Sequence, residues 1–134
     1  DRTRFAGRYR GEGRWLDIAG ESKPYHVVMQ ISAAREQLTV TYTHDFYEEG
    51  SATNGEFVFV FSSDAILATT MKGAEVGNGY LFDDYLHFNI RAGDIFVETS
   101  YQITLAGLQV RGSSTRNAQG RFIGWHERLV RDNT

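Results

Sequence analysis

Histidines and polar side chains that alternate with apolar ones are the residues of this sequence that could bind a ligand or catalyse a reaction. The four histidines form neither an H-x-H nor an H-E-x-x-H pattern, so we predict no metal site. His44 alternates with apolar residues, which favours an interior position. His26 lies opposite the apolar face of its segment and His87 lies among polar residues, so both are expected outside. His126 stays undecided, because both faces of its segment are mixed.

Carboxylates on apolar faces are the second group with possible chemistry. Asp17 follows Trp15 by two residues and shares its face. A buried carboxylate costs free energy unless it is paired. Asp17 therefore either caps the turn that follows or acts as an acid or base of raised pKa in a cavity. The same two interpretations hold for Glu98 and Glu127.

Tyrosines and a threonine on the same predicted faces would give an interior pocket of mixed polarity. Such a pocket suits a small aromatic or partly polar ligand. No G-x-S-x-G, P-loop or Rossmann motif is present, so the catalytic residues, if there are any, remain unknown. The candidate ligand-binding residues from this pattern are Tyr9, Asp17, Tyr42, His44, Thr99 and Tyr101.

The elements that must position these side chains are about ten short strand-like segments separated by turn residues. The expected spans are 5–18, 24–33, 37–47, 55–63, 65–72, 79–83, 85–92, 94–105, 107–116 and 120–131. No apolar period of 3.6 residues persists over three turns. We therefore expect one all-β domain over residues 1–134, an antiparallel up-and-down barrel of about ten strands, because closure removes the edge strands. A two-sheet sandwich is the alternative.

Alternation sets the expected inward face of most segments. In the first segment arginines and a glutamate share one face, so Tyr9, Gly11, Gly13 and Trp15 face inward. Inward glycines allow sharp coiling and the close approach of another backbone or a ligand. The last segment, RFIGWHERLVR, gives no clear phase, since either alternate set carries apolar and charged residues.

Gly13-Arg14-Trp15 resembles the G-x-W signature of the calycins, the lipocalins and their relatives. The resemblance implies a calycin barrel in which Trp15 fills one end under an arginine of the last strand. Arg128 or Arg131 would supply that cation–π partner.

The string Gly7-x-Tyr9-x-Gly11-x-Gly13 is also similar to the glycine-rich first strand of nitrobindin-like haem-binding barrels. That resemblance implies a haem, with His126 near the C-terminal end as its ligand. His126 thereby joins the candidate ligand-binding residues. No other cofactor is expected.

Composition and charge limit the partners. A net charge of −3 without a basic patch argues against nucleic acid, and no apolar run is long enough for a membrane span. The segment FVFVF is apolar on both faces, which indicates a covered outer surface or a homodimer contact. That contact would use Phe57, Phe59 and Phe61, or Val58 and Val60.

The chain begins at Asp1 without methionine, so a removed leader or a trimmed chain is expected. We expect a soluble protein. A cytoplasmic location is slightly favoured, and export after removal of a leader stays open.

The leading functional prediction is binding of a small, mostly hydrophobic or aromatic ligand inside the barrel. One alternative is an enzyme on the same scaffold, an isomerase, lyase or cyclase that uses interior aspartate, histidine and tyrosine. A haem-binding protein and a purely structural or partner-binding barrel are the others. The sequence names neither the ligand nor a reaction.

Overall fold

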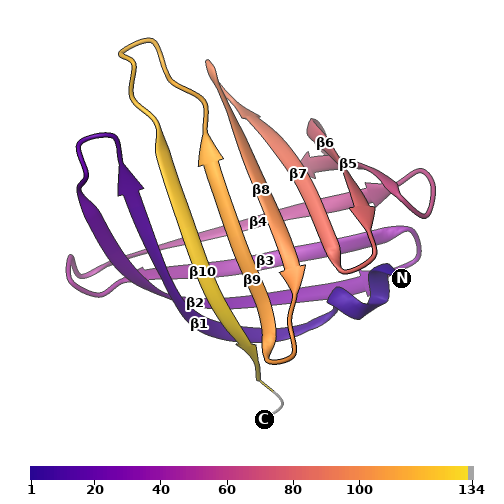
Figure 1. Ribbon diagram of the computed structural model, residues 1–134. Helices are drawn as coiled ribbons and strands as arrows, with labels where there is room; N and C mark the ends of the chain where they lie inside the picture. The colour runs from indigo at the N-terminus through magenta and orange to yellow at the C-terminus, as the bar shows by residue number, and fades with distance from the viewer. Residues whose placement is uncertain (133–134) are drawn as a thin grey trace.

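The computed structural model describes residues 1–132, and its ten strands close into a single barrel (Figure 1). Neighbouring strands are antiparallel throughout, in the order β1-β10-β9-β8-β7-β6-β5-β4-β3-β2. The prediction of an all-β up-and-down barrel is thus confirmed. A 3-10 helix, η1 (Arg2–Phe5), precedes β1 (Gly7–Asp17), β2 (Ser22–Ala34), β3 (Gln37–Phe46), β4 (Ser51–Phe61), β5 (Ile66–Met71), β6 (Ala74–Phe82), β7 (Tyr85–Ala92), β8 (Ile95–Ile103), β9 (Gly107–Ser114) and β10 (Ile123–Arg131).

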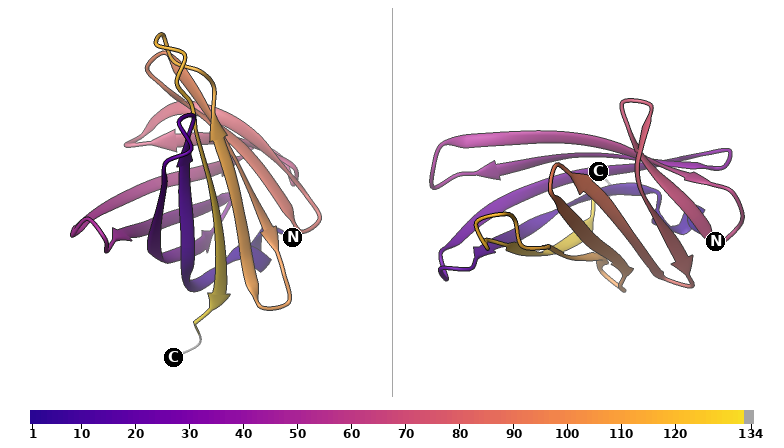
Figure 2. Two further views of the ribbon diagram at one scale, coloured as in Figure 1. Left: turned by 60° about the vertical axis from the view of Figure 1, so that its left-hand side comes forward. Right: turned by 90° about the horizontal axis from the view of Figure 1, so that it is seen from above.

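Two sides of the barrel have strands that run crosswise to each other. In Figure 1, β2, β3 and β4 run across the view, whereas β7 to β10 run steeply from top to bottom. The view from above in Figure 2 shows the long β2–β4 side lying over the β7–β10 side. Inward side chains of β2 and β3 therefore face those of β8 to β10.

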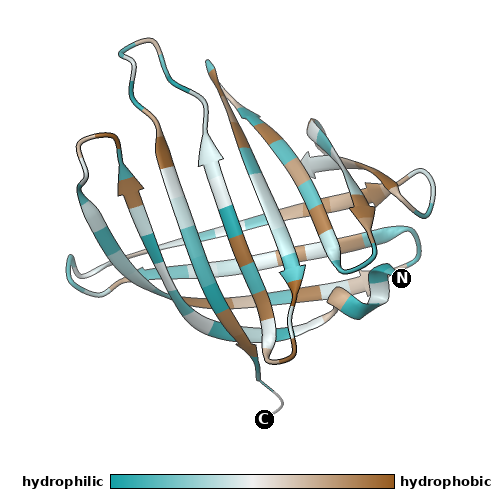
Figure 3. Ribbon diagram, viewed as in Figure 1, coloured by the Kyte–Doolittle hydropathy of each residue, from teal (hydrophilic) through white to brown (hydrophobic). Residues whose placement is uncertain are grey.

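Period-two alternation accounts for the core. Polar and apolar residues alternate along most strands in Figure 3, as expected for a wall with one wet and one dry face. The inward sets predicted for the first, second, third, eighth and ninth segments are confirmed. In β10, whose phase the sequence left open, Glu127 and Leu129 are buried, whereas Arg128 and Val130 are exposed.

The phenylalanines of FVFVF belong to this core. Phe57, Phe59 and Phe61 are buried, while Val58 and Val60 alternate with them and are half-buried on the outer side. The predicted homodimer contact through the three phenylalanines is therefore wrong, because their rings pack inside the barrel. Only the two valines of this segment are available on its outer face.

Strand β6 is longer than the sequence predicted. The expected spans leave residues 73–78 outside any strand, yet β6 begins at Ala74. Its pairing with β5 shifts in register between Thr69 and Thr70. Close approach of the β7 backbone explains Gly77 and Gly79. A Cβ on Gly77 would lie 1.8 Å from the carbonyl oxygen of Asn89, so the pairing with β7 requires glycine there.

Tyr9 and Arg131 close one end of the barrel. The Arg131 guanidinium lies 5.0 Å from the centre of the Tyr9 ring and donates hydrogen bonds to the carbonyls of Ala6 and Arg4, at 2.8 and 2.6 Å. The Tyr9 hydroxyl donates to the carbonyl of Phe5 at 2.7 Å. These contacts join β1, β10 and the 3-10 helix η1 at this end of the barrel.

The predicted pairing of Trp15 with Arg128 or Arg131 is wrong. Trp15 is only partly buried, near the opposite end of β1, and the cation over its ring is Lys23, at 5.3 Å. The aromatic–arginine pair expected from the resemblance is formed by Tyr9, six residues earlier and also two residues after a glycine. Because this position is a tyrosine, a search for the G-x-W signature does not find it.

Among residues 1–132 no helix has the length and apolar character needed to cross a membrane.

Candidate functional site

A buried carboxylate, Glu127 of β10, lies at the centre of the candidate site. Its exposed fraction is 2%. The Tyr25 hydroxyl donates a hydrogen bond to Oε2 of Glu127 at 2.8 Å, and Nε2 of His44 lies 3.4 Å from the same oxygen. The other oxygen, Oε1, is buried and has no hydrogen-bond partner among residues 1–132. Because buried polar atoms are normally paired, this unpaired oxygen requires an explanation.

Glycines on neighbouring strands leave space for the aromatic rings near Glu127. Gly13 pairs with Tyr25 on one side and with Glu127 on the other, and a Cβ on Gly13 would lie 2.4 Å from the Tyr25 ring. The tyrosine therefore reaches across β1 to the carboxylate only because position 13 has no side chain. This close approach of the Tyr25 ring explains why position 13 of the first strand is a glycine.

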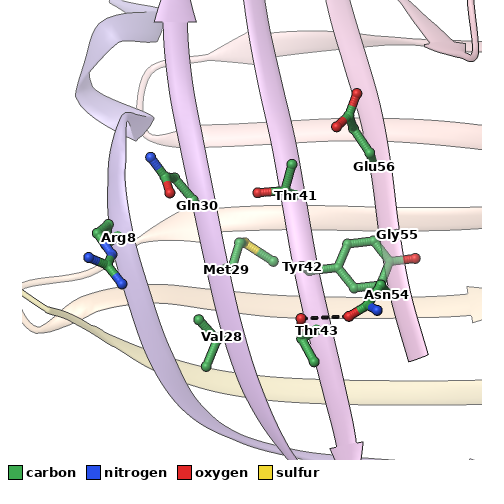
Figure 4. Close-up of a pocket in the computed structure, with 10 residues that line it drawn as sticks. All are labelled: Arg8, Val28, Met29, Gln30, Thr41, Tyr42, Thr43, Asn54, Gly55 and Glu56. Atoms are coloured by element: carbon green, nitrogen blue, oxygen red, sulfur yellow. Dashed lines mark hydrogen bonds between the residues drawn. The ribbon is translucent and has the colours of Figure 1, made fainter. Parts of the chain in front are cut away.

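Two further glycines hold rings in the same way. A Cβ on Gly55 would lie 2.2 Å from the ring of Tyr42, and one on Gly112 would lie 2.2 Å from the ring of Trp125. In Figure 4 the Tyr42 ring lies across Gly55 of β4. Cross-strand pairs of an aromatic residue and a glycine thus line up three rings along the inner wall.

Burial sets the protonation of the site. It raises the pKa of Glu127 to about 7, against the smaller lowering effect of the Tyr25 hydrogen bond. It lowers the pKa of His44 to about 4, so the imidazole is neutral at pH 7. Burial first, and then the Glu127 carboxylate, raise the pKa values of Tyr25, Tyr42 and Tyr101. The phenols stay protonated, and Glu127 is the group that titrates near neutrality.

A cavity of about 130 Å³ lies beside these groups inside the barrel. His44 lies between two tyrosines, with its ring centre 4.6 Å from those of Tyr25 and Tyr42. On the facing side the Phe88 and Tyr101 rings are 5.3 Å apart. The wall is formed by Met29, Tyr42, His44, Phe57, Phe88, Ile90, Val97, Thr99, Tyr101, Val110, Trp125 and Glu127.

Four of the seven candidate ligand-binding residues line this one cavity: Tyr42, His44, Thr99 and Tyr101. Tyr9 instead closes the barrel end. Asp17 caps the turn after β1, where its Oδ1 accepts hydrogen bonds from the amides of Ala19 and Glu21, both at 3.0 Å. This is the first of the two roles considered for Asp17.

His126 does not reach the interior. It alternates with the inward residues of β10, and its Nε2 lies 3.1 Å from the side-chain nitrogen of Gln109 on the outer face. A haem inside the barrel would need an inward ligand and far more room than the 130 Å³ cavity. His126 is therefore not placed to bind a haem inside the barrel, contrary to what the nitrobindin resemblance implied.

Sequence reasoning left Glu127 ambiguous and missed Tyr25 and Trp125 as parts of the site. The available signal was the presence of glycines at positions 13, 55 and 112, each of which leaves room for a ring from the neighbouring strand. In residues 1–132 no cluster of three or more histidine, aspartate or glutamate side chains could hold a metal ion.

Several larger hollows lie elsewhere on the barrel, and two of them include residues next to the site. One, of about 530 Å³, lies over β1 to β4 and is lined mostly by polar side chains, among them Arg8, Gln30 and Glu56 (Figure 4). Thr43 and Asn54, joined by a hydrogen bond of 2.7 Å, also line it. The other, of about 490 Å³, lies between the β1–β2 turn and the β9–β10 loop. Trp15 lines this second hollow and pairs with Trp125, two residues from Glu127.

We expect the stability of the protein to depend on pH through Glu127. Between pH 4.5 and 7 the folded state keeps a proton that the unfolded chain has released, so this contribution falls as pH rises and levels off above pH 7. The expected loss is on the order of 3 kcal/mol. His44 acts oppositely, because below pH 6.5 the unfolded chain binds a proton that the folded state rejects until about pH 4.

Comparison of the protein with Glu127→Gln isolates the glutamate, since His44 is common to both. Urea unfolding at pH 5 and pH 8 should show the variant gaining stability relative to the parent as pH rises. Glu98→Gln, at an exposed position of β8, is the control. Parallel pH profiles for the parent and Glu127→Gln would contradict the assignment.

The fold has a clear structural relative. The structure of the S-type phycobiliprotein lyase CPES from Guillardia theta aligns with a TM-score of 0.77 over 98% of this chain and 90% of that one, at 12% identity. A redesigned beta barrel aligns over 96% of this chain and 92% of that one with 13% identity and a TM-score of 0.45, too low to define a shared topology. No protein-family model matches the sequence, and no curated protein does.

The closed ten-strand barrel has a lipocalin-like fold of the calycin type, as the resemblance in the first strand implied. At 12% identity the likeness to the lyase concerns the fold alone.

Proposed function

We propose that the protein binds a small, mostly apolar or aromatic ligand inside the barrel, beside Glu127. The observation that carries this proposal is the buried, unpartnered Oε1 of Glu127 at the wall of an aromatic cavity. A core selected only for stability would rarely keep a carboxylate there, because an unpaired buried acceptor destabilises the folded state.

The size of the cavity limits the ligand. An apolar cavity of about 150 Å³ takes up benzene, and this one has about 130 Å³. The cavity is therefore close to the size of a single aromatic ring. The surrounding Phe57, Phe88 and Tyr101 rings offer edge and face contacts to such a ring.

Binding of toluene is the direct test. We expect toluene to shift the NMR signals of cavity residues in a saturable way. Val97→Phe places a ring in the cavity and should abolish the shifts, whereas Val58→Phe, on the outer face, should retain them. Saturable shifts that survive Val97→Phe, or no shifts in the parent protein, would contradict interior binding.

A second candidate is acid–base catalysis in the same cavity, an isomerase, lyase or cyclase reaction. It is favoured by Glu127, whose pKa of about 7 suits a general base or acid near neutrality. Tyr25 and His44 contact the carboxylate, whereas Asp17 has only its turn-capping role. The protein of similar fold is a phycobiliprotein lyase, so a lyase reaction is among these candidates.

A further inference from the structure

We propose that the ligand carries an N–H donor that binds Oε1 of Glu127, as an aromatic amine or a nitrogen heterocycle would. This inference rests on the proposed interior binding and names the chemical class of the ligand. It follows from the missing hydrogen-bond donor to Oε1, from the lack of positive charge around the carboxylate, and from the aromatic lining of the cavity.

The carboxylate of Glu127 lacks a donor on one side. Two oxygens of an ionised carboxylate can accept about four hydrogen bonds. Within residues 1–132 its polar contacts go to Oε2, from the Tyr25 hydroxyl at 2.8 Å and from Nε2 of His44 at 3.4 Å. Oε1 has none within residues 1–132. A ligand that supplies a donor to Oε1 would remove this deficit.

The groups that face Glu127 do not supply a positive charge. Its pairing partners are Gly13 on β1 and Val110 on β9, neither of which titrates. The titratable groups around it are Tyr25 on β2, Tyr42 and His44 on β3, and Tyr101 on β8.

Burial keeps these phenols protonated and the imidazole uncharged at pH 7. Within the described part of the chain, no lysine or arginine forms an ion pair with Glu127. The ionised site therefore has a surplus of acceptors, which favours a ligand that donates.

The wall favours an aromatic framework for that donor. The rings of Tyr42, Phe57, Phe88 and Tyr101 line the cavity together with Trp125. A compact ring with one polar edge would contact these rings with its faces and Glu127 with its N–H group. A long flexible amine would leave this wall unfilled.

A donor ligand binds the ionised carboxylate better than the protonated one, so its affinity depends on pH. With a pKa of about 7, the ionised fraction of Glu127 falls about tenfold from pH 8 to pH 6. The apparent affinity for a donor should fall by the same factor. A ligand that accepts a hydrogen bond from protonated Glu127 would show the opposite trend.

Aniline and toluene form a matched pair of probes, because they have nearly the same shape and differ in the N–H donor. We would measure both dissociation constants by NMR titration at pH 6 and pH 8, with the parent protein and Glu127→Gln. We expect aniline to bind the parent about tenfold more tightly at pH 8 than at pH 6, and toluene to bind equally at both. In Glu127→Gln the pH dependence of aniline binding should disappear, and aniline should lose about tenfold relative to toluene at pH 8.

The possible results distinguish the donor inference from interior binding itself. Equal binding of toluene and aniline, unchanged by pH or by Glu127→Gln, would overturn the donor inference and leave interior binding intact. Aniline that binds more tightly at pH 6 than at pH 8 would also overturn it. Failure of both probes to bind would overturn the interior site itself and the inference with it.

Discussion

Phe59→Ala is expected to lower the free energy of unfolding by about 3–5 kcal/mol, as truncation of a fully buried aromatic side chain usually does. Phe59 has an exposed fraction of 1% and packs against Phe57, Phe88 and Tyr101, with ring centres 5.3, 4.7 and 6.3 Å away. Its loss would leave a void between the two crosswise sides of the barrel. Urea unfolding followed by circular dichroism measures the change.

Val60→Ala is the matched control on the same strand. Val60 points outward and is half-buried, so its truncation should cost less than about 1 kcal/mol. A larger loss at Val60 than at Phe59 would mean that the inner and outer faces of β4 are reversed, and that the phenylalanines are on the surface after all.

Gly13→Ala is expected to have the second largest effect, about 2–4 kcal/mol of lost stability. The new Cβ would lie 2.4 Å from the Tyr25 ring, which the hydrogen bond to Glu127 holds in place. The ring must move, and the carboxylate then loses its only hydroxyl donor. Urea unfolding gives the stability, and the NMR signals of Tyr25 report its displacement.

Gly124→Ala is the control for this prediction. Its Cβ would meet only the carbonyl oxygen of Gly112, at 3.6 Å, so the change should cost less than about 1 kcal/mol. Equal losses for the two alanine variants would show that glycine at position 13 serves backbone freedom in general and not the seating of Tyr25.

The barrel could be predicted from the sequence because alternation is a local signal. Tyr25, Val27, Met29 and Ile31 repeat every second residue between turn residues, and they are buried as that period requires. Ten such strand segments, with no helical segment predicted between them, restrict the fold to a barrel or a two-sheet sandwich.

The phase of β10 could not be predicted, because both alternate sets of the segment RFIGWHERLVR contain apolar and charged residues. Only the pairing with β1 and β9 decides the face. Glu127 lies between Gly13 and Val110, both inward, and this places the carboxylate inside. The inward position of Glu127 therefore depends on how β10 pairs with its neighbours. The sequence of β10 alone does not determine this pairing.

The closing pair of the barrel was misassigned for a different reason. A motif search selects Gly13-Arg14-Trp15, whereas Gly7-Arg8-Tyr9 has the same spacing and actually meets Arg131. The contact between Tyr9 and Arg131 joins residues about 120 positions apart in the chain, and no local sequence pattern indicates it.

Titration of the Glu127 side chain by NMR tests the central claim most directly. Carboxyl carbons labelled with carbon-13 would be followed from pH 3 to pH 10, with Glu127→Gln used to assign the signal. The structure predicts a pKa of about 7 for Glu127, raised by burial, with a fall toward its ordinary value of 4.5 when a donor such as aniline is bound. A pKa near 4.5 in the free protein would contradict the account, because it would mean that the carboxylate is solvated or already fully paired.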